Sequence, residues 1–365
     1  MSLKCGIVGL PNVGKSTLFN TLTKAANAQA ANFPFCTIEP NIGMITVPDA
    51  RLTKLEELVN PERVLPTTVE LVDIAGLVKG ASKGEGLGNM FLGNIRSVDA
   101  IVHVIRCFED ENVVHVDGSI NPIRDKEVID TELQLKDLES LEKFMAKNQK
   151  AAKAGDKTAK KLVEVTEMYI NHILTGKSAR SLEIEEDDKD LIKDLNLLTI
   201  KPTLYACNVD EKSAVTGNAF TEQIRVVAEQ EGAEILIISA KVESEIVMMD
   251  EEDQAMFLED LGLTESGMDR LIQASYRLLQ LETYFTAGVK EVRAWTIHKN
   301  TKAPQAAAVI HTDFEKGFIR AEVMAYEDFV TLGSEAACKE KGKFRVEGKE
   351  YVVKDGDILH FRFNV

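Results

Sequence analysis

One segment, Gly9-Leu-Pro-Asn-Val-Gly14-Lys15-Ser16, constrains the fold more than any other. It matches the pattern GxxxxGK[ST] at every position, with a β-rich run before it and helix-forming residues after it. The glycines let the backbone wrap around phosphate groups, so that its N–H groups and the N-terminus of the next helix point at the anion. A chance glycine turn before a helix is the alternative, and the strand–loop–helix context argues against it. The candidate phosphate-binding residues are Asn12, Val13, Gly14, Lys15, Ser16 and Thr17.

Two of these residues have predicted roles in phosphate chemistry. We expect Lys15 to neutralise β- and γ-phosphate oxygens and to act in catalysis, and Ser16 to bind Mg²⁺ through its hydroxyl. Asn12 has two open interpretations, because its side-chain oxygen can bind a monovalent cation beside the phosphates or can simply hold the loop.

A second motif, Asp73-Ile-Ala-Gly76, begins at the acidic residue that ends the apolar run Val69–Asp73. A P-loop fold needs a carboxylate at this place, so we expect Asp73 to hold the water shell of Mg²⁺ and the Gly76 N–H to contact the γ-phosphate. Leu77 follows, where many GTPases have a glutamine that orients the attacking water. Because leucine cannot do this, unaided hydrolysis should be slow, or another group must supply the polarisation.

Three further residues are candidates around this site. Thr37 lies between the P-loop helix and Asp73, where a threonine that closes onto Mg²⁺ belongs, although an ordinary loop threonine fits the spacing too. His115 follows the acidic stretch Phe108-Glu-Asp-Glu-Asn112 and is a candidate catalytic group. His103 alternates within a buried strand, so we interpret it as structural.

The base site is predicted at Asn208-Val209-Asp-Glu211, where a GTPase has NKxD. The asparagine matches, but Glu211 replaces the aspartate that accepts two hydrogen bonds from guanine. Losing this geometry removes the main reason to prefer GTP, unless the longer Glu211 side chain still reaches the base. Ser239-Ala-Lys241 follows the next strand and matches the loop that closes over the base in such proteins.

The spacing of these motifs indicates an insertion. Roughly 130 residues separate Gly76 from Asn208, about twice what one helix–strand–helix passage requires. Apolar residues at helical spacing on both sides of Ala154-Gly-Asp156 predict two long antiparallel helices. We therefore expect an α/β nucleotide-binding domain with a parallel sheet, interrupted by a helical hairpin and followed by a small β domain. The predicted boundaries are 1–127 with 200–281, 128–199, and 282–365.

Composition limits the classes of partner and the compartment. The 365 residues have a net charge of −16, which argues against nucleic-acid binding over the whole surface but leaves room for a local basic patch. No apolar run is long enough for a membrane helix, and no signal peptide is expected. The scattered cysteines fit neither a disulfide framework nor a zinc site, so we predict a cytoplasmic protein. They are Cys5, Cys36, Cys107, Cys207 and Cys338.

Several long segments together resemble the Obg-like ATPases, and in particular the bacterial YchF subfamily of P-loop proteins. The resemblance covers the whole chain and is carried by Gly9–Thr17, Asn32–Asn41, Asp73–Asn89, Asn208–Glu211 and Thr283–Thr296. Ile310–Val323 is similar to the TGS domain, a small β-grasp module.

The resemblance implies a Mg²⁺-dependent P-loop ATPase that prefers ATP to GTP and associates with the ribosome. It implies Mg²⁺ on Ser16 and Thr37, and adenine contacts from Asn208 and the backbone of Val209, in the base site that also includes Ser239. K⁺ is an additional candidate cofactor, with Asn12 as its ligand. We expect ATP and the ribosome as partners, no membrane, no DNA, and a monomer.

Other functions stay open at this stage. In one, ATP only sets the conformation of a regulatory module and hydrolysis is incidental; in another, the protein is a GTP-preferring GTPase. A P-loop kinase for small molecules would need an Arg-rich lid, which the sequence lacks. A basic cluster near the hairpin tip is either a solvated helix face or a contact with ribosomal RNA phosphates. Its lysines are Lys143, Lys147, Lys150, Lys153, Lys157, Lys160 and Lys161.

Overall fold

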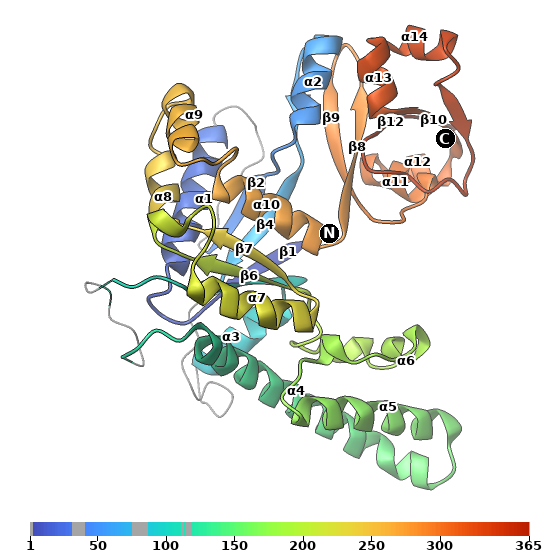
Figure 1. Cartoon of the computed structure of the whole chain (residues 1–365). Helices are drawn as coiled ribbons and strands as arrows, with labels where there is room; N and C mark the ends of the chain where they lie inside the picture. Colours follow the sequence, from blue (N-terminus) through green and yellow to red (C-terminus); the bar gives the residue numbers. More distant parts are fainter. Residues whose placement is uncertain (1–2, 31–40, 75–86, 111–112, 114–117, 365) are drawn as a thin grey trace. The chain divides into compact units, whose positions relative to one another are not determined.

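The structure is a computed structural model that describes residues 3–30, 41–74, 87–110, 113 and 118–364 (Figure 1). By its internal contacts the chain forms two compact units. The described residues of the first unit are 3–25, 41–43, 70–74, 87–110, 113 and 118–271, and those of the second are 26–30, 44–69 and 272–364.

The first sheet has the strand order β2-β4-β1-β5-β6-β7. The described pairings β1–β4, β1–β5, β5–β6 and β6–β7 are all parallel. The carboxyl ends of parallel strands meet at one edge, so this edge collects the P-loop, Asp73, Asn208 and Ser239, and the predicted α/β fold class is confirmed. The strands are β1 (Lys4–Val8), β2 (Ile42–Thr46), β4 (Thr68–Asp73), β5 (Ala100–Arg106), β6 (Thr203–Asn208) and β7 (Glu234–Ile238).

Helices connect these strands. The acidic segment Glu243–Asp260 is helical by its composition, and the structure divides it between two helices. The chain turns at residues 247–250, and the Asp250 side chain caps the second helix by accepting a hydrogen bond from the Asp253 N–H. The helices are α1 (Lys15–Ala30), α3 (Leu87–Arg96), α7 (Ala219–Glu231), α8 (Ala240–Ile246), α9 (Glu251–Asp260) and α10 (Gly267–Leu278).

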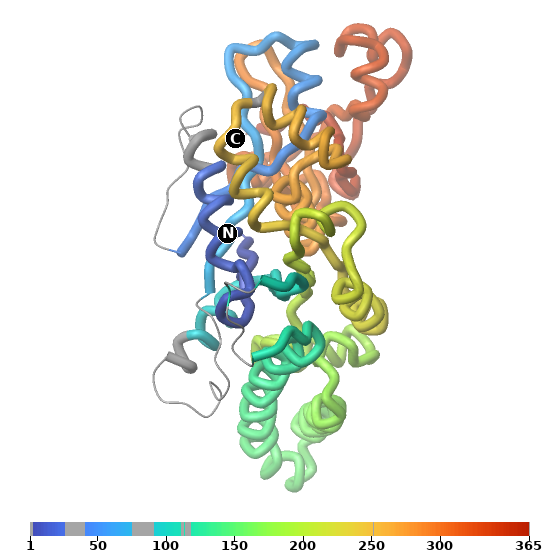
Figure 2. Tube along the Cα trace, turned by 60° about the vertical axis from the view of Figure 1, so that its left-hand side comes forward, coloured from blue at the N-terminus to red at the C-terminus, as the bar shows by residue number. Residues whose placement is uncertain are grey.

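The predicted helical hairpin is present as α4 (Pro122–Lys153) and α5 (Lys157–Leu174). Figure 2 shows the two helices side by side and joined at one end. Gly155 adopts a φ of 98° in the turn, and the Asp156 side chain caps α5. With 32 residues, α4 spans about 48 Å. Its return to the sheet passes through η2 (Ala179–Ser181), α6 (Glu186–Asp190) and η3 (Lys193–Leu195).

The second unit contains a sheet with the strand order β11-β10-β12-β8-β9-β3. One core includes Tyr284, Phe318 and Phe361 beside α11, and another includes Leu55, Phe285 and Phe329 beside α2 and α13. The strands are β3 (Val64–Leu65), β8 (Leu281–Ala287), β9 (Val292–His298), β10 (Phe318–Ala325), β11 (Arg345–Glu347) and β12 (Asp357–Phe363). The helices are α2 (Ala50–Val59), α11 (Ala303–Ile310), α12 (Thr312–Lys316), α13 (Tyr326–Leu332) and α14 (Glu335–Glu340).

Two segments of this unit are defined by their partners. Residues 44–69 belong by their contacts to the second unit, in which β3 pairs in parallel with β9. The β-rich residues of Glu350–Val353 predict a strand, but this segment forms only an isolated bridge between Val352 and Lys302. The boundaries of independently folding domains stay a prediction.

Four of the five cysteines lie in the described part of the chain. Cys5, Cys107, Cys207 and Cys338 are buried free thiols, and Cys36 lies outside the described residues. Over the same described part of the chain, no helix has the length and apolar character that a membrane crossing requires.

Candidate nucleotide-binding site

The P-loop backbone has conformations that its sequence requires. Gly14 has a φ of 93°, and a Cβ atom added there would lie 2.2 Å from Nδ2 of Asn208. A Cβ atom added at Gly9 would lie 2.7 Å from the carbonyl oxygen of Val104. Asn12 has a φ of 63°, a region that asparagine tolerates better than most residues. The tight loop is therefore fixed by glycines with no room for a side chain.

The loop encloses a cavity of about 410 Å³ that opens beside the first turn of α1. The Leu18 N–H donates to the Gly14 carbonyl at 3.0 Å and starts the helix, whose first turn has no acidic residue. The N-terminal N–H groups of α1 thus remain suited to an anion. The lining residues are Leu10, Pro11, Asn12, Gly14, Lys15, Ser16 and Thr17.

The ammonium group of Lys15 donates to the carboxylate of Asp73 in this structure. The two side chains are 8% and 16% exposed, so the pair is largely shielded from water. Strands β1 and β4 bring them together, because Ile7 is the register partner of Asp73. A phosphate in the cavity would compete with Asp73 for the same ammonium group.

The donors at this site fit a Mg²⁺ ion. Magnesium prefers oxygen ligands, and the exposed Ser16 hydroxyl and the nearby Asp73 carboxylate supply them. Within the described residues no group of three His, Cys, Asp or Glu side chains could hold a metal by itself. A metal here would therefore need further ligands, such as nucleotide phosphates and water.

Asn208 ties two loops together through its side-chain amide. Its Nδ2 donates to the Val13 carbonyl at 2.9 Å, and its Oδ1 accepts from the Ala240 N–H at 2.9 Å. The residue is 3% exposed and lies at the carboxyl end of β6. The P-loop and the loop after β7 are thus held at a fixed separation by one side chain, a role that the sequence motif alone did not reveal.

The rest of the predicted base site has mixed features. The Val209 N–H donates to the Ile238 carbonyl at 2.9 Å, so only the carbonyl of Val209 remains for a base contact. The Ser239 side chain is buried, and its Oγ atom has no hydrogen-bond partner among the described residues. Glu211 is exposed at the start of η4 (Glu211–Ser213). These contacts to a base stay a prediction.

His103 is a structural residue by its surroundings. It is 3% exposed, and its ring lies 5.8 Å from that of Tyr205. Burial, together with the nearby positive charges of Lys126 and Arg180, lowers its pKa to about 3, so the imidazole is neutral at physiological pH. The other candidates, Thr37, Gly76, Leu77 and His115, lie outside the described residues.

Comparisons with known proteins agree with this architecture. A family model described as a 50S ribosome-binding GTPase matches residues 4–153, and a model of the YchF GTPase C-terminal region, described as a protein of unknown function, matches residues 281–364. Proteins named ribosome-binding ATPase YchF match over the full length of both chains, at 58% identity in Haemophilus ducreyi, 56% in Bacillus subtilis and 55% in Escherichia coli O157:H7.

The chain belongs to the YchF family of P-loop nucleotide hydrolases. A solved structure of the Schizosaccharomyces pombe YchF GTPase is similar at a TM-score of 0.90 and 39% identity, and the match covers 99% of this chain and 98% of that one. The predicted family and fold are thereby confirmed, including the helical insertion and the C-terminal β domain.

Proposed function

We propose that this protein is a Mg²⁺-dependent ATP-hydrolysing switch that prefers ATP to GTP and associates with the ribosome in the cytoplasm. The observation that carries the proposal is the P-loop cavity. There Lys15 contacts Asp73, with which a phosphate would compete, and Asn208 connects the P-loop to the loop after β7. Its full-length relatives are named ribosome-binding ATPases, which supports the choice of reaction and partner.

The residues of the cavity suit phosphoryl transfer to water. Backbone N–H groups of the P-loop and α1 bind the phosphates, and Lys15 leaves Asp73 to neutralise charge on the transferred group. Ser16 and Thr37 would hold Mg²⁺, and Asp73 would hold the water shell of the ion, which would supply positive charge to neutralise phosphate oxygens. Because Leu77 cannot orient water, His115 is the candidate for that role, and Asn12 is the candidate ligand for K⁺.

The preference for ATP follows from the residue at the guanine-reading position. Glu211 replaces an aspartate and lies exposed on a short 3₁₀ turn. A GTP-preferring enzyme is the second candidate, and it is favoured by the name of the solved relative, a YchF GTPase. Dissociation constants for ATP and GTP at equal Mg²⁺ decide between them. We expect tighter binding of ATP and a shift toward GTP in Glu211→Asp, and a tenfold preference for GTP would contradict the proposal.

The catalytic role of the P-loop has its own test. We expect Lys15→Ala to lose nearly all ATP hydrolysis while its circular dichroism spectrum stays that of the wild type. Turnover measured with and without ribosomes then distinguishes a ribosome-regulated enzyme from a module in which hydrolysis is incidental. Wild-type turnover in Lys15→Ala would exclude this loop as the active site.

A further inference from the structure

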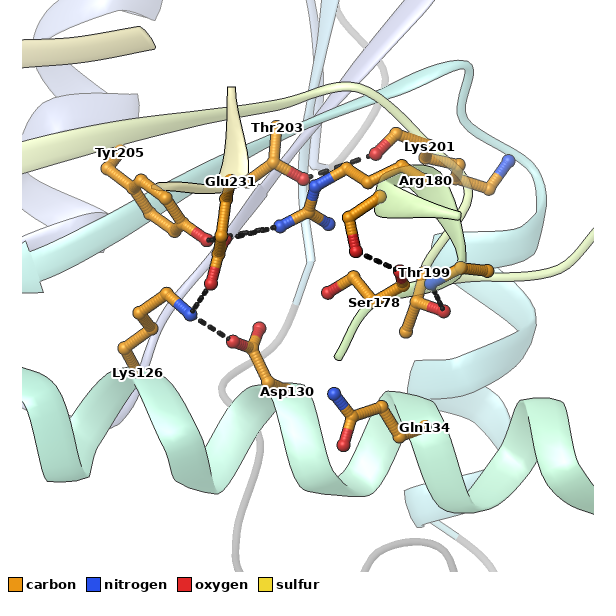
Figure 3. Close-up of polar contacts among 12 residues, drawn as sticks. Lys126, Asp130, Gln134, Ser178, Arg180, Thr199, Lys201, Thr203, Tyr205 and Glu231 are labelled. Carbon is orange, nitrogen blue, oxygen red and sulfur yellow. Dashed lines mark hydrogen bonds and ion pairs between the residues drawn. The ribbon is translucent and has the colours of Figure 1, made fainter. Parts of the chain in front are cut away.

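A largely buried group of charged side chains lies where the helical insertion meets the nucleotide-binding sheet. We call it the Glu231 cluster, and Figure 3 shows its members directed toward one another from α4, the return segment, strand β6 and the end of α7. It consists of Lys126, Asp130, Arg180, Tyr205 and Glu231.

Glu231 is the shared acceptor of this cluster. Its Oε1 atom accepts from Nζ of Lys126 at 2.6 Å. Its Oε2 atom accepts from a guanidinium nitrogen of Arg180 at 2.9 Å and from the Tyr205 hydroxyl at 2.5 Å. Lys126 also donates to Asp130 at 2.5 Å. One carboxylate therefore receives donors from three separate segments of the chain.

The cluster is balanced in charge and shielded from water. Two cations face two carboxylates, and the adjacent His103 is neutral because burial lowers its pKa to about 3. The Lys126 side chain is 5% exposed and Tyr205 is fully buried. Removing one of the four charged members leaves an uncompensated charge in a poorly solvated place, and removing the Tyr205 hydroxyl takes one donor from Glu231, so the members are expected to move together.

A separate anchor holds the same helix without reaching the sheet. Asp137 of α4 accepts from the N–H groups of Leu198 and Thr199 at 2.7 and 2.8 Å, and from the Thr199 hydroxyl. These bonds attach α4 to its own return segment. The Glu231 cluster joins α4 to the end of α7 and, through the Tyr205 hydroxyl, to β6. Ile123 of α4 also packs against the apolar core that includes Tyr205.

Strand β6 continues from the cluster to the nucleotide site. Tyr205 and Asn208 lie three positions apart on this strand, which is buried along its whole length and paired with β5 and β7. Asn208 in turn holds the Val13 carbonyl of the P-loop. If α4 moves and the Glu231 cluster moves with it, the buried strand β6 therefore carries this displacement to the P-loop.

We propose that Glu231 and Tyr205 are positioning residues that couple the helical insertion to the P-loop through β6 and Asn208. This inference rests on the proposed nucleotide binding. Coupling between two sites is reciprocal, so nucleotide must stabilise the base of α4 to the same extent that a fixed insertion favours nucleotide.

Amide hydrogen exchange of the full chain, with and without an ATP analogue and Mg²⁺, tests the proposal. In the wild type we expect the nucleotide to slow exchange in 9–18 and also, by about fivefold or more, in 122–137. Tyr205→Phe removes only the hydroxyl oxygen, and we expect it to keep the protection of 9–18 and to lose that of 122–137. We expect the same pattern of protection in Glu231→Gln. If Glu231→Gln does not fold, the result for Tyr205→Phe decides the test.

The control is Tyr169→Phe, at a buried tyrosine of α5 that packs in the insertion's own core. It should keep both protections. If 122–137 is unprotected in the wild type, or stays protected in Tyr205→Phe, the coupling is wrong while nucleotide binding stands. If even 9–18 shows no protection, the proposed function fails and this inference fails with it.

Discussion

Replacing Asn208 by alanine tests whether this residue ties the nucleotide loops together. Its amide donates to the Val13 carbonyl and accepts from the Ala240 N–H, both at 2.9 Å and at a position that is 3% exposed. Asn208→Ala removes both bonds and leaves a buried carbonyl and a buried N–H group without these partners. The P-loop is then no longer held against the end of β6.

The expected size of the effect follows from these two groups. A buried polar group that loses its partner costs about 1–3 kcal/mol, so the variant should lose about 2–6 kcal/mol of stability. For a unit of this size each kcal/mol lowers the midpoint of thermal unfolding by about 2–4 °C, which predicts a drop of at least about 4 °C. ATP must also order the loop that Asn208 held, so we expect affinity at least about tenfold weaker.

Thermal unfolding and equilibrium ATP binding measure the two effects, and Asn218→Ala is the matched control. The Asn218 amide is engaged in the same way, since Nδ2 donates to the Cys107 carbonyl at 2.7 Å and Oδ1 caps α7. It touches no P-loop residue in these contacts, so its loss should lower stability but leave ATP affinity within about twofold. Equal loss of affinity in both variants, or an unchanged Asn208→Ala protein, would refute the reasoning.

Two further predictions concern charge. Burial keeps the pKa of His103 near 3, below its ordinary 6.5. Between these two pH values the unfolded chain binds more protons at this site than the folded chain does. The free energy of unfolding therefore falls as pH falls, with a limiting slope of about 1.4 kcal/mol per pH unit. His103→Gln should flatten the acid limb of urea-unfolding stability against pH, and an unaltered slope would contradict this. Replacing four exposed lysines at the hairpin tip by glutamate should weaken co-sedimentation with ribosomes and reduce its salt dependence, while ATPase activity without ribosomes stays nearly unchanged. If the variant pellets with ribosomes as well as the wild type across a salt series, the tip is not the contact, and the C-terminal β domain becomes the better candidate. The four are Lys147, Lys150, Lys157 and Lys160.

Much of the fold could be predicted because its signals are local. The continuous apolar run Val69–Asp73 marked β4, and apolar residues at helical spacing marked α4 and α5 on the two sides of Gly155. The β-rich character of Glu350–Val353 was misleading, since this segment forms a single isolated bridge, at Val352, and no continuous strand pairing. Propensity reports what a segment can form, whereas a strand also requires a neighbouring edge with free hydrogen-bonding groups.

The sequence by itself determined the phosphate site, because a glycine-rich turn before a helix presents N–H groups to an anion wherever it occurs. Only the tertiary structure decided that Asn208 braces the P-loop, that Glu231 receives donors from the helical insertion, and that residues 44–69 join the second unit. The Asn208–Val13 bond joins residues 195 positions apart, and the Glu231–Lys126 bond joins residues 105 apart. Such contacts leave no periodic or local trace in a sequence, since they depend on which strands become neighbours and on which polar groups burial forces to pair.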